Sequence, residues 1–284
     1  MNAARLLGAW LLVATANGGA MAGEPFDLEG PDKDADGVLT YTLRSPCEEG
    51  PCPLRILPPA DLRAGAEYRF LFVLPVEAKG GKRFGDGFAE VKKLNLHTRL
   101  GLIVVAPSWS FWPWYADHPA KPERRQEGFF LTAVLPAVDK LYPTKKPCRL
   151  LLGFSKSGWG AFTLLLRHPE LFAAAAAWDA PLMKEKPDQF EMPGVFATQA
   201  NLEPYQVTKL LRERAAALGR EKRLALLGYG DFRDHIQKAH ALMQELKIPH
   251  DYSDGPRREH LWGSGWLPEA IEALDAMTRA RTTP

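Results

Sequence analysis

The chain has 284 residues, of which 46% are hydrophobic and 25% are charged, and its formal net charge is +2. A chain of this length and apolar content can bury one large core or two small ones. Because the charge is nearly balanced and no basic stripe stands out, we set nucleic-acid binding aside.

The first 22 residues have the pattern of a cleaved signal peptide. An arginine precedes an apolar run over residues 6–14, and Ala20 and Ala22 supply small side chains where a signal peptidase cuts. The run is short for a membrane span, and no later stretch is long and apolar enough to be one. We expect a secreted or periplasmic protein without stable membrane insertion after cleavage. An uncleaved N-terminal anchor is the alternative.

Export permits disulfide bonds, and the chain has three cysteines. Cys47 and Cys52 lie in SPCEEGPCP, where a disulfide between them could close a small ring. Their nearness permits pairing without requiring it. Cys148 precedes an apolar segment and is expected to be a buried small side chain. No Cys and His spacing suggests a zinc site, and the sequence implies no metal and no organic cofactor.

From residue 37 onward, predicted strands alternate with segments of helical spacing. Strands are predicted at residues 37–46, 53–60, 67–76, 101–109, 148–155, 173–179, 223–230 and 249–256. Helices are predicted at residues 88–100, 124–143, 158–172, 206–219, 234–247 and 266–280, with an irregular stretch at 180–205. This alternation implies an α/β fold, a mostly parallel central sheet with helices on both faces. No linker divides the mature chain, so we expect a single domain over residues 23–284.

The segment RLLLGFSKSGWGAF, residues 149–162, predicts a strand, a sharp turn and a helix. A nucleophile elbow has this layout, and the residues two before and two after its nucleophile must be small. With Ser155 as the nucleophile, these positions hold Gly153 and Ser157. With Ser157 as the nucleophile, one of them holds Trp159, whose indole is hard to fit. We therefore predict Ser155 as the nucleophile; a strand-to-helix turn without chemistry is the alternative.

A serine hydroxyl needs a base, and the base needs an orienting acid. In this layout both follow the nucleophile, at the carboxyl ends of later strands. His260 lies after the last predicted strand and before the last helix, and it is the predicted base. Asp231, at the end of the strand over 223–230, is the first choice for the acid. Asp179, after the preceding strand, and Asp234, which could instead be a helix N-cap, are the alternatives.

These residues resemble the esterase D-like branch of the α/β-hydrolases, which includes S-formylglutathione hydrolases, feruloyl and acetylxylan esterases and mycolyl-transferring antigens. The matching parts are GFSKSGWGAF, SFWPWYADHP with the helix after it, and REHLWGSGW, within about residues 65–280. Ser157 departs from the glycine usual at its position. The resemblance implies the α/β-hydrolase fold and hydrolysis of carboxylic esters by a Ser–His–Asp triad through an acyl-enzyme.

The resemblance also implies an oxyanion hole made of backbone N–H groups. One donor is Lys156, directly after the nucleophile, and the other comes from the loop near Val76 and Glu77. The side chain of Lys156 is expected to be solvated and to have no role.

Aromatic residues gather beside both predicted catalytic segments and are candidates for the substrate pocket: Trp109, Trp112, Trp114, Tyr115 and Trp262. They could wall an apolar acyl pocket or stack on sugar rings, so the expected substrate is a small-molecule or carbohydrate-linked ester. Anchoring of the loops in the core is an equally good interpretation. A peptidase or acyltransferase with the same triad, or a catalytically silent binding protein of the same fold, remains as the alternative function.

Overall fold

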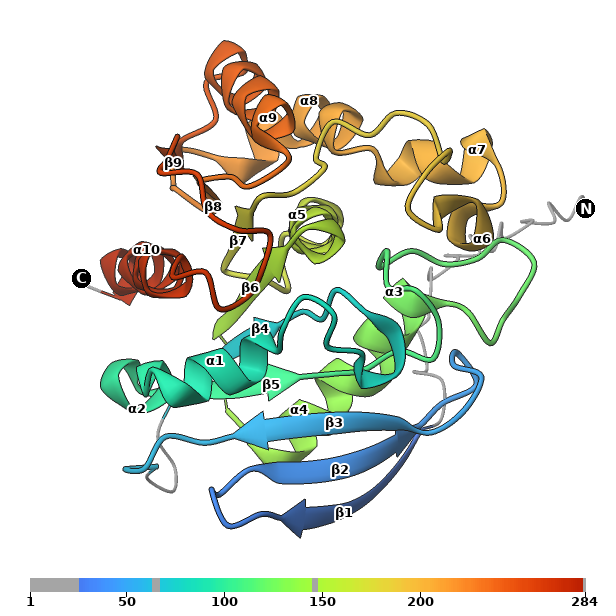
Figure 1. Ribbon diagram of the computed structural model, residues 1–284, viewed down its shortest axis with the longest axis vertical. Coiled ribbons are helices and arrows are strands. Elements are labelled where there is room, and N and C mark those ends of the chain that lie inside the picture. The colour runs from blue at the N-terminus through green and yellow to red at the C-terminus, as the bar shows by residue number, and fades with distance from the viewer. Residues whose placement is uncertain (1–25, 63–66, 145–147, 283–284) are drawn as a thin grey trace, which may run out of the picture.

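The central feature of the computed structural model, which describes residues 26–62, 67–144 and 148–282, is one twisted sheet (Figure 1). Its nine strands lie in the order β1-β2-β3-β5-β4-β6-β7-β8-β9. Strands β1, β2, β3 and β5 pair antiparallel, whereas β5, β4, β6, β7, β8 and β9 pair parallel. The strands are β1 Asp27–Lys33, β2 Leu39–Arg44, β3 Cys52–Leu57, β4 Arg69–Val73, β5 Leu102–Ala106, β6 Cys148–Phe154, β7 Ala174–Trp178, β8 Leu224–Leu227 and β9 His250–Ser253.

Helices cover both faces of this sheet, as predicted (Figure 1). One face packs against α1 Gly87–Lys93, α2 Leu96–Leu100 and α10 Leu267–Thr282. The other packs against α3 Gln126–Phe129, the π-helix η2 Phe130–Val134, α4 Leu135–Leu141, α5 Lys156–Arg167, α8 Val207–Leu218 and α9 Arg233–Glu245. Four short helices lie in loops: η1 Ala78–Gly80, α6 Met192–Phe196, α7 Gln199–Leu202 and η3 Glu203–Tyr205.

The local structure differs from the sequence expectation in a few places. The helix expected over 88–100 is divided at Asn95, whose left-handed backbone (φ 53°) ends the hydrogen-bond ladder between α1 and α2. The stretch expected to be irregular, 180–205, contains α6, α7 and η3. Strand β1 was not predicted, because DLEGPDK is polar and almost wholly exposed and therefore lacks the alternation of a half-buried strand.

The disulfide that the sequence permits between Cys47 and Cys52 is not formed in this structure, in which both residues are buried thiols. The Cys52 thiol faces the Glu48 carboxylate, with 3.8 Å between Sγ and Oε2. The Arg125 guanidinium donates to the Cys47 sulfur at 3.6 Å. Burial raises the pKa of both thiols.

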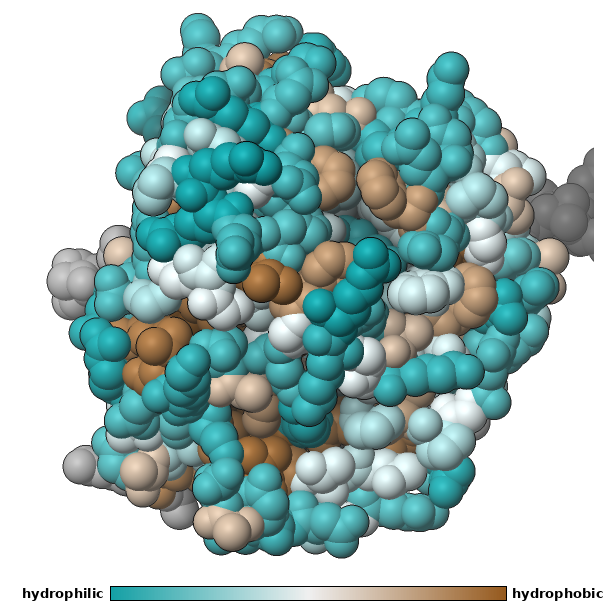
Figure 2. Space-filling model, in the orientation of Figure 1, coloured by the Kyte–Doolittle hydropathy of each residue, from teal (hydrophilic) through white to brown (hydrophobic). Residues whose placement is uncertain are grey.

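The predicted signal peptide, residues 1–22, lies outside the described residues. In the part of the chain that is described, no helix has the length and apolar character that a bilayer crossing requires. On the face shown in Figure 2, hydrophilic residues predominate and hydrophobic ones form small separate patches. Large exposed apolar side chains in the described residues are few, and one of them, Phe190, is 46% exposed.

Candidate active site

Ser155 lies at the turn between β6 and α5, with its backbone at φ 54° and ψ −131°. A left-handed φ is uncommon for a residue with a Cβ, and such strain persists only where the surrounding structure enforces it. The buried strand β6 ends at Phe154 and α5 begins at Lys156, so the chain reverses within this one residue. The turn therefore presents the Ser155 hydroxyl at the carboxyl edge of the sheet.

The second serine of the segment has a different environment. Ser157 is fully buried, and its Oγ donates to the Phe154 carbonyl at 2.8 Å and accepts from the Phe154 N–H at 3.0 Å. Its hydroxyl is thus already paired with the backbone of β6 and closes the turn from inside. These contacts agree with the choice of Ser155 as nucleophile, since the position two residues after it is crowded.

We expect Gly153→Ala to disrupt the turn between β6 and α5 that presents Ser155. A Cβ at Gly153 would lie 2.1 Å from the Ser157 carbonyl oxygen and 2.5 Å from the Gly158 nitrogen, both backbone atoms that cannot move without displacing α5. Overpacking of this kind costs about 1–3 kcal/mol or more. Thermal unfolding should show a lower Tm together with lost activity. Gly50→Ala is the control for a glycine substitution without a clash, because no atom lies within 4 Å of the added Cβ and the Gly50 backbone is not left-handed. Unchanged activity in Gly153→Ala would contradict the crowding argument.

His260 joins Ser155 to a buried carboxylate. Its Nε2 is 3.1 Å from the Ser155 Oγ, and its Nδ1 is 2.5 Å from Oδ2 of Asp179. Because Nδ1 donates to the carboxylate, Nε2 is left as the acceptor for the serine proton. The ring is packed between aromatic side chains, with Phe154 at 4.4 Å and Phe84 at 5.3 Å between ring centroids. These contacts hold the imidazole in one orientation.

The first choice for the acid, Asp231, is corrected by this geometry. The Asp231 carboxylate is 60% exposed and pairs with Arg257 at 3.4 Å. Asp231 contributes instead through its backbone, since its N–H donates to Oδ2 of Asp179 at 2.9 Å. Asp234 lies in the first turn of α9 and pairs with Lys238. Asp179, the second candidate, directly follows β7 and is the one that contacts His260.

Asp179 is held as an anion although it is fully buried. Burial alone would raise the pKa of this carboxyl, but hydrogen bonds from His260 and from the backbone N–H groups of Asp231 and Phe232 lower it below its usual value. The backbone of Asp179 is itself strained, because its φ of 43° lies in the left-handed region. A buried, ionised and hydrogen-bonded carboxylate can fix the tautomer of His260 and stabilise its protonated form.

Ser155 and His260 open into a cleft of about 370 Å³. The cleft is lined by Val76, Glu77, Arg83, Phe84, Trp112, Trp114, Ser155, Lys156, Pro181, Phe190, Glu191, Asp231, Phe232 and His260. It lies among five loops: those after β4, β8 and β9, the aromatic loop after β5 that carries Trp112 and Trp114, and residues 180–206. We call residues 180–206 the connecting segment because they join β7 to α8. Val76 and Glu77, the residues suggested for the second oxyanion donor, line this cleft beside Ser155.

Of the five aromatic residues suggested for the pocket, Trp112 and Trp114 line the cleft and the others do not. Trp109 is fully buried and stacks on Phe130. Tyr115 packs under Gly160 of α5, where an added Cβ would lie 2.0 Å from the ring. Trp262 lines a separate cavity of about 240 Å³ on the other side of the loop after β4.

The residue that holds the aromatic loop in place is not among those predicted from the sequence. Gln126 is almost fully buried, and its Oε1 accepts from the backbone N–H groups of Trp114 and Tyr115, both at 2.9 Å. Its amide nitrogen donates to the Trp112 carbonyl at 2.8 Å. The only available signal was a polar residue at the start of a helix that follows the aromatic run. Phe232 and Phe84 were also missed, although both follow strands at the carboxyl edge.

The expectation that the Lys156 side chain is solvated is wrong. Lys156 is 8% exposed, and its ammonium pairs with Glu191 of the connecting segment at 3.2 Å. It also lies over the ring of Trp112, 4.5 Å from the centroid. The side chain therefore forms part of the wall of the cleft.

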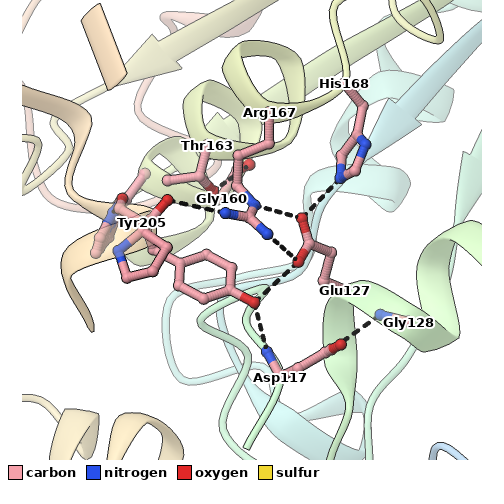
Figure 3. A network of polar contacts seen from close by, with 10 residues as sticks. Asp117, Glu127, Gly128, Gly160, Thr163, Arg167, His168 and Tyr205 are labelled. Carbon is pink, nitrogen blue, oxygen red and sulfur yellow. Dashed lines mark hydrogen bonds and ion pairs between the residues drawn. The ribbon is translucent and has the colours of Figure 1, made fainter. Parts of the chain in front are cut away.

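A buried carboxylate on α3, that of Glu127, ties this helix to the connecting segment and to the end of α5 (Figure 3). Glu127 accepts two hydrogen bonds from Arg167, at 2.6 and 2.9 Å, one from His168 at 2.7 Å and one from the Tyr205 hydroxyl at 2.9 Å. The Tyr205 oxygen also accepts from the Asp117 N–H at 3.2 Å. Glu127 thus joins three segments that are far apart in the sequence.

No group of three or more His, Cys, Asp or Glu side chains in the described ranges is arranged to hold a metal ion. The chemistry that the described residues offer is that of a hydroxyl, an imidazole and a carboxylate in series, next to a partly aromatic cleft. This series supplies a nucleophile, its base and the orienting acid.

A family profile described as "Putative esterase" matches residues 103–255, more than half of the chain. The chain belongs to the Esterase family. Strands β6 to β9, all but the first residue of β5, Ser155 and Asp179 lie within the matched residues, and His260 lies five residues beyond them. A search of curated proteins found no match for this esterase.

Solved structures share the fold of the esterase. A ferulic acid esterase is 22% identical, with a TM-score of 0.67 over 85% of this chain and 97% of its own. The S-formylglutathione hydrolase of Agrobacterium tumefaciens is 15% identical, with a TM-score of 0.67 over 88% of this chain and 99% of its own. The fluorophosphonate-binding serine hydrolase F of Staphylococcus aureus is 16% identical, with a TM-score of 0.66 over 87% of this chain and 99% of its own.

These likenesses confirm the predicted α/β-hydrolase fold, and the family confirms the resemblance drawn from the sequence. The esterase is a carboxylic ester hydrolase.

Proposed function

We propose that the protein is an exported serine esterase that cleaves carboxylic esters with Ser155 as nucleophile, His260 as base and Asp179 as orienting acid. The observation that carries the proposal is the unbroken series of short contacts, 3.1 Å from Ser155 to His260 and 2.5 Å from His260 to Asp179. The proposal of export rests on the N-terminal pattern of the sequence.

In the proposed reaction, Ser155 attacks the ester carbonyl while Nε2 of His260 takes its proton. The Asp179 carboxylate stabilises the imidazolium that forms. Backbone N–H groups of Lys156 and of the loop at Val76 and Glu77 would hold the oxyanion of the tetrahedral intermediate. His260 then protonates the leaving alcohol, and water, activated by the same imidazole, releases the acid from Ser155.

The proposed substrate is a small-molecule or carbohydrate-linked ester with an apolar or aromatic part. Trp112, Phe190 and Phe232 line the cleft, and aromatic side chains contribute contact area and ring stacking to binding. One structural neighbour is named as a ferulic acid esterase, whose name implies an aromatic acid.

Labelling with a fluorophosphonate probe, run beside hydrolysis of an activated short-chain ester, tests the proposal. We expect the unaltered protein to be labelled and active, and Ser155→Ala to lose labelling and at least about a thousandfold of kcat/KM. Ser157→Ala is the matched control, since its hydroxyl pairs with the backbone of Phe154; it should keep the label even if its Tm falls. Label retained by Ser155→Ala, or lost only in Ser157→Ala, would overturn the assignment of the nucleophile.

A further inference from the structure

The residue after the nucleophile carries a buried positive charge. The Lys156 ammonium has two partners, the Glu191 carboxylate at 3.2 Å and the face of Trp112 at 4.5 Å. Burial lowers the pKa of Lys156, while the charges of Glu191 and Glu77 act in the opposite direction and that of Arg83 adds to the lowering. A charge in such a place needs a counter-charge, because an unpaired buried ammonium is costly.

The carboxylate that supplies the counter-charge is placed by a strained part of the connecting segment. Phe190 and Glu191 are consecutive residues with left-handed backbones, at φ 54° and φ 62°. This conformation is unfavourable for side chains with a Cβ, and it persists where contacts over-determine it. The Phe190 carbonyl accepts from the indole N–H of Trp114 at 2.7 Å, and its ring packs against Phe232 at 5.9 Å. These contacts place the Glu191 side chain over Lys156.

The pair neutralises one wall of the cleft. An ester without charge can lie against this wall while Lys156 and Glu191 stay together. An ester with a carboxylate on the part that reaches the wall must either displace Glu191 from Lys156 or lie against a pair that is already neutral, where its own charge has no partner. Both alternatives cost binding free energy that a neutral ester of the same length does not lose.

We propose that the Lys156–Glu191 pair is a specificity determinant that restricts the cleft to esters uncharged at this wall. The inference rests on the proposed function, since it concerns the substrate of the Ser155 site. It gives a role to a side chain that the ester-cleaving reaction itself does not use.

Two variants are expected to change the specificity in opposite directions. Glu191→Gln leaves the Lys156 ammonium without its closest carboxylate, so a substrate carboxylate can take that place. Lys156→Met keeps the length of the side chain and the backbone N–H but leaves Glu191 uncompensated, so a substrate carboxylate is repelled. A change that only loosened the connecting segment would shift both variants in the same direction.

The experiment compares kcat/KM for esters matched in length. In the acyl series the pair is nitrophenyl hexanoate and nitrophenyl hydrogen adipate; in the alcohol series it is hexyl acetate and the acetate of hydroxyhexanoic acid. In Glu191→Gln we expect the ratio of kcat/KM for the anionic ester to kcat/KM for the neutral ester to rise about tenfold in one of the two series. A tenfold change corresponds to the contribution of one charge-assisted hydrogen bond at a partly exposed site. In Lys156→Met the same ratio should fall below that of the unaltered protein.

Asp188→Asn is the matched control, because Asp188 pairs with Lys184 within the same connecting segment and does not line the cleft. It should leave the ratio unchanged. The inference is overturned if the unaltered protein hydrolyses the neutral esters and neither variant changes the ratio in either series, or if both change it in the same direction. If the unaltered protein hydrolyses none of the esters, the proposed function fails and the inference fails with it.

Discussion

Asp179→Asn is expected to lower kcat/KM about ten-thousandfold while the protein remains folded. Oδ2 of Asp179 accepts from Nδ1 of His260, and Oδ1 accepts from the Phe232 N–H. An amide that keeps the second contact turns its NH₂ group toward Nδ1. The imidazole must then accept at Nδ1 and carry its proton on Nε2, so it cannot take the proton of Ser155.

The measurement is steady-state kinetics with a short-chain ester, alongside thermal unfolding. Asp234→Asn is the matched control, because this carboxylate is 72% exposed and pairs with Lys238 on its own helix. Asp231→Asn should cost less than about tenfold, since its contact with Asp179 comes from the backbone. A larger loss in Asp231→Asn than in Asp179→Asn would restore Asp231 as the orienting acid.

Glu127→Gln is expected to produce the largest loss of stability among single substitutions of ionised groups, about 3 kcal/mol, the lower end of the range for breaking a buried ion pair. The Glu127 side chain is 7% exposed and neutralises Arg167, which is 25% exposed. The amide cannot accept from Arg167, His168 and Tyr205 at once, so a guanidinium is left without its counter-charge. Denaturant unfolding measures the change. Glu245→Gln, in an exposed pair with Arg212, should stay within about 0.5 kcal/mol of the unaltered protein.

The same carboxylate gives the stability a defined dependence on pH. Burial would raise the pKa of Glu127, but the hydrogen bonds and charges of His168 and Arg167 outweigh it and lower the pKa from 4.5 to about 2. A carboxyl whose pKa is lower in the folded state stabilises the fold above its unfolded pKa, and that contribution is lost as the pH falls toward 2. The stability difference between the unaltered protein and Glu127→Gln should therefore shrink between pH 4.5 and pH 2. A constant difference over this range would contradict the assigned role of the charge.

The parts of the site that the sequence predicted are those governed by local rules. Ser155 could be chosen because crowding at Gly153 and Ser157 is a property of one turn. His260 could be chosen because strand order places the last loop at the carboxyl edge. The fold class followed from the alternation of buried strands and helices, for which β6 and β7 give unbroken apolar runs.

The parts that were missed depend on which segments meet in space. Asp231 and Asp179 both follow strands at the same edge, and nothing local shows which of the two has its carboxylate buried. The difference arises because the Asp231 backbone folds over Asp179 and donates to it. Lys156 was expected in water because a long cation at a helix start is usually solvated, and its partner Glu191 is 35 residues away in a stretch without clear periodicity. Gln126 and Glu127 were missed for the same reason, since their partners lie on other segments.

The connecting segment between β7 and α8 contains helices and turns but contributes no strand to the sheet, and all its residues are described. Because the entropy of closing a loop grows by only about 0.6 kcal/mol for each doubling of its length, insertions in the exposed turns of this segment should cost little stability. Asp179 directly follows β7 and precedes this segment. The positions of the catalytic groups therefore need not change when the segment is altered. The exposed turns of this stretch are accordingly the place where an engineer can change the range of substrates, provided that buried side chains such as Phe196 and Tyr205 are kept.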